Sequence, residues 1–100
     1  GKLQEIGKYE DEYIRGYIER FYENGNIKES GYIYEWNKGE FQKRGIFENF
    51  YENGRLREKG KYSYYGKKDG LFEYFSKNGK LIKKENYEDG ELIWIKKFLN

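Results

Sequence analysis

One ten-residue stretch, GIFENFYENG at residues 45–54, decides the fold. It recurs as GYIERFYENG at residues 16–25 and as GLFEYFSKNG at residues 70–79, so the chain is built from repeats. Successive starting glycines lie 29, 25 and 20 residues apart, if Gly90 opens the next unit. Repetition of this kind is typical of arrays in which each unit stacks on its neighbours. We therefore expect one array over residues 1–100, with a half unit at 1–15, units at 16–44, 45–69 and 70–89, and a half unit at 90–100.

Each unit has the pattern of a β-hairpin. Asn-Gly between strand-like residues favours a two-residue type I′ turn, because both central positions of that turn need positive φ. Counting outward from such a turn at residues 53–54 places Phe47 opposite Gly60, Glu48 opposite Lys59 and Phe50 opposite Arg57. A large ring then lies across from a position without a side chain, which fills the gap that a strand glycine leaves.

A further two-residue turn is indicated at Asp89-Gly90. It would set Tyr87 against Leu92 and Glu85 against Trp94. The differences in unit length fall at residues 36–40 and 66–69, so we expect loops there.

The expected fold class is all-β. Neighbouring hairpins should pair in sequence order to give an elongated antiparallel β-meander, a single twisted sheet of about eight strands. Because a single sheet has no second layer to cover it, its core should be a thin aromatic layer along one face.

The composition excludes much chemistry. His and Cys are absent, which removes the imidazole base, the thiolate nucleophile and the best transition-metal ligands. Most Glu residues face a Lys or Arg in the inferred register, as in Glu48–Lys59, Glu52–Arg55, Glu73–Lys84 and Arg20–Glu29, and the three Asp residues are isolated. We therefore expect no enzyme activity, no metal site, no cofactor and no small-molecule substrate.

The charge pattern bears on partners. Twenty basic and 18 acidic residues are interspersed, giving a net charge of +2. This balance does not favour binding to nucleic acid or to an anionic lipid surface. The abundance of Lys, Ile, Tyr, Asn and Glu is typical of a low-GC bacterium, and both a cytoplasmic and a cell-surface or secreted location stay open.

The repeat resembles a known family. Its pattern, Gly-x-[Phe/Ile]-Glu-x-Phe-[Tyr/Ser]-x-Asn-Gly-x-[Leu/Ile]-x-x-x-Gly-x-Tyr, is similar to the MORN repeat, in the bacterial variant that also resembles YwqK-type antitoxins. The resemblance implies hairpin arrays that serve as interaction scaffolds, often self-associating, with no catalytic residues. The first unit departs from the family pattern at Ile18, where an aromatic residue is expected. The third unit departs from it at Ser76 and Glu85.

The candidate partner-binding surface is the aromatic face of the sheet. The protein should be a scaffold that binds a protein partner along this face, or it should self-associate through its terminal strands. The alternative is an antitoxin or immunity protein that neutralises a toxin. The same rings are expected to form the core, and both roles can hold if each ring is half buried by its neighbours and half open to a partner. The inferred register assigns to this face Tyr22, Phe47, Tyr51, Tyr62, Phe72, Tyr74, Tyr87 and Trp94.

Two further apolar sets are visible. Phe21, Phe50 and Phe75 recur on the opposite, charged face, where they form either a satellite cluster or a row for contact with another chain. Residues 92–99 are the most apolar stretch, and an exposed apolar edge strand is a template for pairing.

Overall fold

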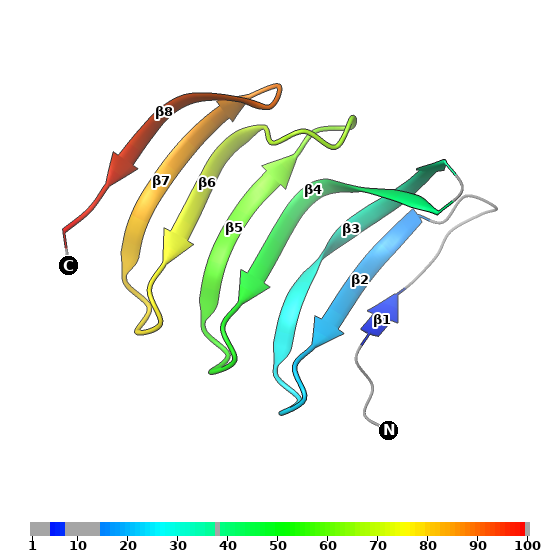
Figure 1. The fold of residues 1–100 in the computed structure, drawn as a ribbon, viewed down its shortest axis with the longest axis horizontal. Helices are drawn as coiled ribbons and strands as arrows, with labels where there is room; N and C mark the ends of the chain where they lie inside the picture. The colour runs from blue at the N-terminus through cyan, green and yellow to red at the C-terminus, as the bar shows by residue number, and fades with distance from the viewer. Residues whose placement is uncertain (1–4, 8–14, 38, 100) are drawn as a thin grey trace.

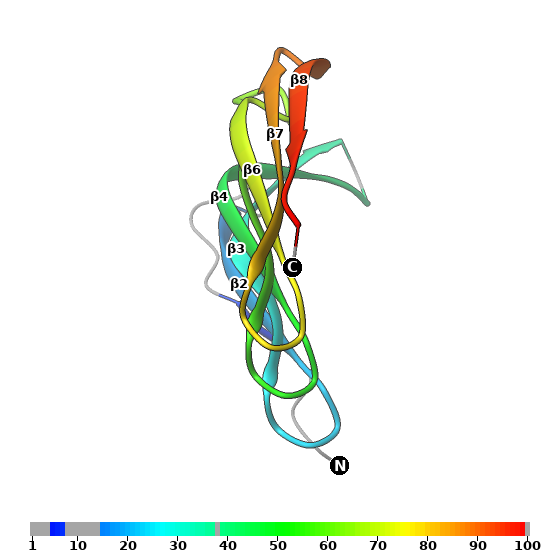
Figure 2. The same ribbon diagram turned by 90° about the vertical axis from the view of Figure 1, so that its left-hand side faces the viewer.

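The computed structural model describes residues 5–7, 15–37 and 39–99, and it forms one sheet. All neighbouring strands are antiparallel, and their spatial order is their sequence order (Figure 1). The sheet measures 46 × 35 × 16 Å and is a single twisted layer (Figure 2), so the predicted all-β meander is confirmed. Most of the half unit expected at residues 1–15 lies outside the described residues. The strands are β1 (Glu5–Gly7), β2 (Arg15–Phe21), β3 (Ile27–Asn37), β4 (Glu40–Phe50), β5 (Leu56–Tyr62), β6 (Gly70–Phe75), β7 (Leu81–Glu88) and β8 (Glu91–Lys97).

The Asn-Gly hairpins do not close with two-residue turns. In the β4–β5 hairpin, the Tyr51 amide donates to the Arg55 carbonyl and the Gly54 amide to the Tyr51 carbonyl, both at 2.9 Å. The loop therefore has three residues. Gly54 has a φ of 90°, whereas Asn53 is not among the residues with positive φ. This is the arrangement of a type I turn followed by a glycine bulge, and the type I′ prediction was wrong.

A bulge restores the predicted register. Phe50 lies opposite Leu56 instead of Arg57, and the register then shifts so that Phe47 faces Gly60, as expected. The extra loop residue moves the pairing by one position, and the bulge moves it back. A slip of one residue would have turned every side chain to the other face. At each tip the bulge leaves a Phe opposite an aliphatic residue, in the pairs Phe21–Ile27, Phe50–Leu56 and Phe75–Leu81.

The turn at Asp89-Gly90 is the predicted two-residue turn. Both residues have positive φ, 49° and 86°, and Tyr87 lies opposite Leu92. The register then shifts, so that Glu85 faces Ile95 and not Trp94. Trp94 faces Asn86, which puts its side chain on the charged face and corrects its assignment to the aromatic face.

One of the two expected loops, at residues 36–40, is mostly strand among its described residues, with a turn at Gly39. β3 continues to Asn37 and β4 begins at Glu40, so the extra residues of the first unit lengthen a hairpin. Between these strands the pairing jumps from Gly31–Phe47 to Tyr32–Arg44. The last part of β3 and the first part of β4 bend out of the sheet together (Figure 2). The other expected loop lies between β5 and β6, as predicted.

The core is buried within a single layer. Ile18, Phe47 and Phe72 are 1%, 2% and 1% exposed. A Cβ built on Gly31 would collide with the ring of Phe47, and one built on Gly60 would collide with the ring of Phe72. Each ring therefore covers a glycine of the preceding hairpin, not the glycine of its own. Ring-over-glycine packing joins neighbouring hairpins as well as filling gaps.

The hairpin tips are joined by hydrogen bonds to the next hairpin. The Tyr22 hydroxyl donates to the Phe50 carbonyl at 2.6 Å, and the Tyr51 hydroxyl donates to the Phe75 carbonyl at 2.7 Å. The side-chain amides of Asn24 and Asn53 donate in the same way, to the carbonyls of Glu52 and Lys77, both at 3.0 Å. The Tyr-x-Asn-Gly motif thus contributes both a turn and a connection between units.

We predict that Gly60→Ala destabilises the sheet by about 1–3 kcal/mol, because the added methyl group overpacks a rigid ring. Its φ is not in the left-handed region, so packing alone is tested. Urea unfolding would measure the loss. Lys61→Ala, on the exposed side of the same strand, should change stability by less than about 0.5 kcal/mol. Adding Phe72→Leu should recover part of the loss, and a stable Gly60→Ala single variant would contradict this packing.

We predict that Tyr51→Phe lowers stability by about 1 kcal/mol, because it removes one hydroxyl donor from the Phe75 carbonyl and leaves the ring in place. Tyr65→Phe, on a ring that is 72% exposed, is the matched control and should have no effect. Thermal unfolding of both variants would compare them. Equal midpoints would show that the tip hydrogen bond adds no stability.

Candidate functional site

The aromatic face carries a ladder of rings. Phe47, Tyr62, Phe72 and Tyr87 follow one another across the strands from β4 to β7. Their successive centroids are 6.2, 5.5 and 5.4 Å apart, with interplanar angles of 74–86°. These are edge-to-face contacts, in which the positive edge of one ring meets the negative face of the next. The ladder brings together half of the residues predicted for the partner-binding surface.

Two lysines lie over this ladder at equivalent places. The Lys43 amine is 4.6 Å from the Phe47 centroid and 5.5 Å from that of Tyr62. The Lys68 amine is 4.8 Å from the Phe72 centroid and 4.9 Å from that of Tyr87. Both are cation–π contacts. Sequence reasoning missed them, although a signal exists, because both lysines stand two residues before the starting glycine of a unit.

The central rings are therefore core and not open surface. Phe47 and Phe72 are buried between a glycine below and tyrosine and lysine neighbours around them. Tyr62 and Tyr87 are half-buried. That a partner contacts these two tyrosines stays a prediction, whereas the two Phe rings present no surface for one.

The other predicted site residues are spread out. Tyr22 and Tyr51 lie at the hairpin tips and use their hydroxyls to join hairpins. Tyr74 is on β6, one position nearer the tips than the ladder, with the Lys83 amine 4.3 Å from its ring centroid. Trp94 lies on the charged face, as described above.

A buried carboxylate replaces glycine in the third unit. Glu85 holds the position that Gly31 and Gly60 occupy in the earlier units, and it is 8% exposed. It accepts hydrogen bonds from the Tyr74 hydroxyl at 2.5 Å and from the Tyr87 hydroxyl at 2.9 Å. The Lys83 amine is 3.8 Å from its second oxygen.

These contacts determine the protonation state of the Glu85 carboxyl group. Burial would raise the pKa of Glu85, but the two hydroxyl donors and the charges of Lys83 and Lys68 outweigh burial, so the pKa is lowered. Burial and the hydrogen bond to the carboxylate raise the pKa of both Tyr74 and Tyr87. The cluster is therefore an ionised carboxylate held by two neutral phenols. Such a group has the features of a fixed structural charge and not of a proton donor or acceptor near neutral pH.

Exposed apolar area lies at the β8 edge. Every residue of β8 is exposed. Leu92, Ile93, Trp94 and Ile95 are 49%, 50%, 44% and 45% exposed. β8 is the last strand of the sheet, so one side of its backbone has no neighbouring strand among the described residues. An apolar edge of this kind is suited to pairing with another strand.

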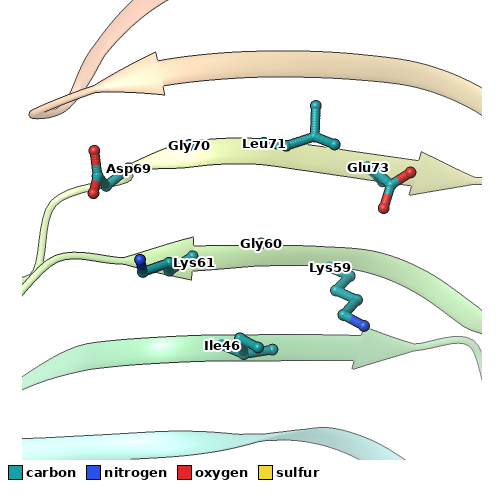
Figure 3. Close-up of a pocket in the computed structure, with 8 residues that line it drawn as sticks. All are labelled: Ile46, Lys59, Gly60, Lys61, Asp69, Gly70, Leu71 and Glu73. Carbon is teal, nitrogen blue, oxygen red and sulfur yellow. The ribbon is translucent and has the colours of Figure 1, made fainter.

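The charged face carries a second exposed apolar group. Tyr32, Ile46 and Leu71 are 56%, 56% and 42% exposed. Ile46 and Leu71 border a shallow depression over β4, β5 and β6, with lysine and acidic side chains around it (Figure 3). The residues that line it are Ile46, Lys59, Gly60, Lys61, Asp69, Gly70, Leu71 and Glu73.

A stacked cation lies near the far end of β4. The Arg44 guanidinium is 3.8 Å from the ring centroids of both Tyr34 and Tyr64. Its Nε is buried without a hydrogen-bond partner. The two rings belong to β3 and to the β5–β6 loop, so this contact joins the bent end of the β3–β4 hairpin to the next connection. Nothing in the sequence pattern pointed to it.

Among the described residues, no three His, Cys, Asp or Glu side chains are grouped to hold a metal ion. Within the same part of the chain, no helix is long and apolar enough to cross a membrane.

Comparison with known proteins identifies the repeat. A family model described as the MORN repeat variant matches residues 16–34, 43–64 and 68–89, together more than half of the chain. The second and third matches begin at Lys43 and Lys68, the two lysines that lie over the ring ladder. No curated protein and no solved structure matches the chain.

We predict that Glu85 contributes stability that depends on pH. Because its folded pKa is lowered, the folded state holds this proton less tightly than the unfolded chain does. The stabilisation is present above the ordinary carboxyl pKa of about 4.3 and is lost as the pH falls through the lower folded pKa. Glu85→Gln should therefore be less stable than wild type at pH 7, and the difference should shrink below about pH 4.

Urea unfolding at a series of pH values would measure this difference. Glu91→Gln, on the exposed β8, is the control and should leave the pH profile unchanged. Tyr87→Phe should weaken the pH dependence in part, because it removes one of the two donors. A Glu85→Gln profile parallel to that of wild type would contradict the assignment.

Proposed function

Because the chain belongs to the MORN repeat variant family, we propose that it is a non-catalytic protein-interaction module that accepts a strand from another polypeptide along β8. Repeats of this family are generally associated with interactions with proteins or membranes. One observation carries the finer proposal: β8 has four successive apolar residues, is exposed in every residue, and is paired on one side only among the described strands. The absence of His and Cys from the sequence supports the non-catalytic part.

Strand addition fits the way this sheet is built. Each inner strand is held by backbone pairing on both sides, so another strand at β8 would continue the same ladder. Main-chain hydrogen bonds provide affinity in this mode, and alternate side chains provide specificity. The added strand belongs either to a protein partner or to the terminal strand of a second copy. Leu92 and Ile95 of β8 would meet it on the aromatic face, and Trp94 would meet it on the charged face.

The antitoxin or immunity role is the alternative, and it is supported by the family resemblance alone. A toxin-like protein encoded beside the gene and co-purifying with this chain would support it. Failure to co-purify with any protein encoded beside the gene would count against it.

We predict that Ile93→Lys abolishes strand addition and leaves the fold intact. Ile93 is the extra residue of the β8 bulge and has no residue opposite it on β7, so a lysine there places a charge on the open edge without replacing a cross-strand contact. Tyr65→Lys, at a more exposed ring away from the edge, is the matched control. Sedimentation at about 100 μM would test end-to-end pairing, and amide hydrogen exchange would report protection of β8.

Two outcomes would contradict end-to-end pairing. One is a strict monomer with a fully folded β spectrum at that concentration. The other is association that Ile93→Lys leaves unchanged. Pairing with a different protein would instead appear as protection of β8 only when that protein is added.

A further inference from the structure

The charged face carries an ordered row of charges. Strand pairing aligns one residue of each strand from β2 to β8, because directly opposite residues share a face. Glu48, Lys59, Glu73 and Lys84 form the centre of this row and alternate in sign. Acidic residues lie toward the β2 side and basic residues toward the β8 side. From β2 to β8 the row reads Glu19, Ser30, Glu48, Lys59, Glu73, Lys84 and Lys96.

Apolar residues flank this row on both sides. Toward the tips lie the half-buried pairs Phe50–Leu56 and Phe75–Leu81. On the other side lie the exposed Ile46 and Leu71, which border the depression (Figure 3). In the described residues no second layer covers this face, which is one side of a single sheet. On such a surface the charged row favours one alignment with a partner surface, because opposite charges must meet. The two apolar rows stabilise the contact when they are removed from water.

We propose that the charged face packs against the same face of a second copy of this chain, about a two-fold axis parallel to the strands and between β5 and β6. This placement lays β5 of one copy over β6 of the other, β4 over β7 and β3 over β8. Lys59 then meets Glu73 of the second copy, and Glu48 meets Lys84. Both contacts occur twice, because a two-fold interface is self-complementary.

The apolar residues match under the same operation. Phe50 comes over Leu81 of the second copy and Leu56 over Phe75, since rows keep their height along an axis parallel to the strands. Tyr32 comes over Trp94 of the second copy, so that two exposed rings cover each other. Leu71 comes over the Lys61 side of the second copy's depression. Aligned sheets pack in this way at about 10 Å, with their strands within roughly 30° of each other.

Other placements fit less well. An axis along β5 would set Lys59 against its own copy and Glu48 against Glu73, and both contacts are repulsive. An axis between β4 and β5 keeps opposite charges together but separates Tyr32 from Trp94, because it lays β3 over β6 and β8 over β1. The charge order and the exposed rings therefore favour the axis between β5 and β6.

The available area is sufficient. A standard stable interface buries about 800 Å² on each partner. The sheet face extends 46 × 35 Å, so less than the whole face is needed. The proposal concerns the face of the sheet and does not depend on strand addition at the β8 edge.

Charge reversal tests the pairing directly. Lys59→Glu alone sets two acidic residues against each other at both symmetric contacts, and Glu73→Lys alone sets two lysines against each other. Each variant should weaken dimerisation about tenfold or more, given roughly 0.2–1 kcal/mol for each exposed pair lost and the repulsion that replaces it. In an equimolar mixture, position 59 of each chain meets an opposite charge at position 73 of the other. The mixture should therefore form a heterodimer with an affinity near that of wild type.

Sedimentation and native mass spectrometry would measure the three samples and the wild type. Both reversals also alter neighbours within the sheet, so a β spectrum must confirm that each variant folds. Leu71→Lys is a second variant that removes no cross-strand charge pair. It should abolish the dimer, because it sets a lysine against Lys61 of the second copy at both symmetric contacts. Tyr65→Lys, on an exposed ring in the β5–β6 loop, is its control and should leave the dimer unchanged.

The results separate this proposal from edge pairing. A heterodimer restored by mixing, with Ile93→Lys still dimeric, supports face-to-face packing and counts against end-to-end pairing. Association that Ile93→Lys abolishes and charge reversal leaves intact overturns face-to-face packing and supports the edge. A monomeric wild type at about 100 μM, or folded variants that do not restore the dimer on mixing, also overturns it. If this face binds a different protein and the chain forms no dimer, the proposal that a second copy covers the face is wrong.

Discussion

The whole sheet depends on one packing contact, an aromatic ring lying over a glycine of the neighbouring hairpin. A single layer cannot bury side chains between two sheets, so its core must form within the layer. Phe47 over Gly31 and Phe72 over Gly60 achieve this, because the missing side chain leaves room for a ring to lie close to the backbone. Tyr62 and Lys43 then close the sides of the Phe47 ring. Burial to 2% in a sheet 16 Å thick follows from this arrangement.

The same contact joins the units into an array, and the third unit departs from it. Each ring reaches back to the preceding hairpin, while each tip tyrosine reaches forward to the next carbonyl. In the third unit both parts change. Ser76 stands in the place of the tip tyrosine, and the carboxylate of Glu85 stands in the place of the glycine. Two tyrosine hydroxyls satisfy that carboxylate, since a buried charge is tolerated only when it is hydrogen-bonded.

The location of the core determines which surfaces remain for binding. Because the central rings are enclosed by their own neighbours, the exposed apolar area lies elsewhere, on β8, on the charged face, at the start of β4 and in the β5–β6 loop. An open strand edge and a patterned face offer different chemistry. The edge presents backbone groups that no other described strand pairs with, whereas the face presents ordered charges between apolar rows. An array built from one repeat therefore exposes two different kinds of surface.

The sequence by itself determined the hairpin repeat, the order of the strands and the central register, including Phe47 opposite Gly60. These follow from local patterns, namely turn residues and alternating side chains. Only the tertiary structure decided the three-residue loops, the β8 bulge that moves Trp94 to the other face, and the lysines over the rings. The reason is that a bulge or a ring contact depends on the neighbouring strand, and a pattern along one strand does not specify how the next one packs against it.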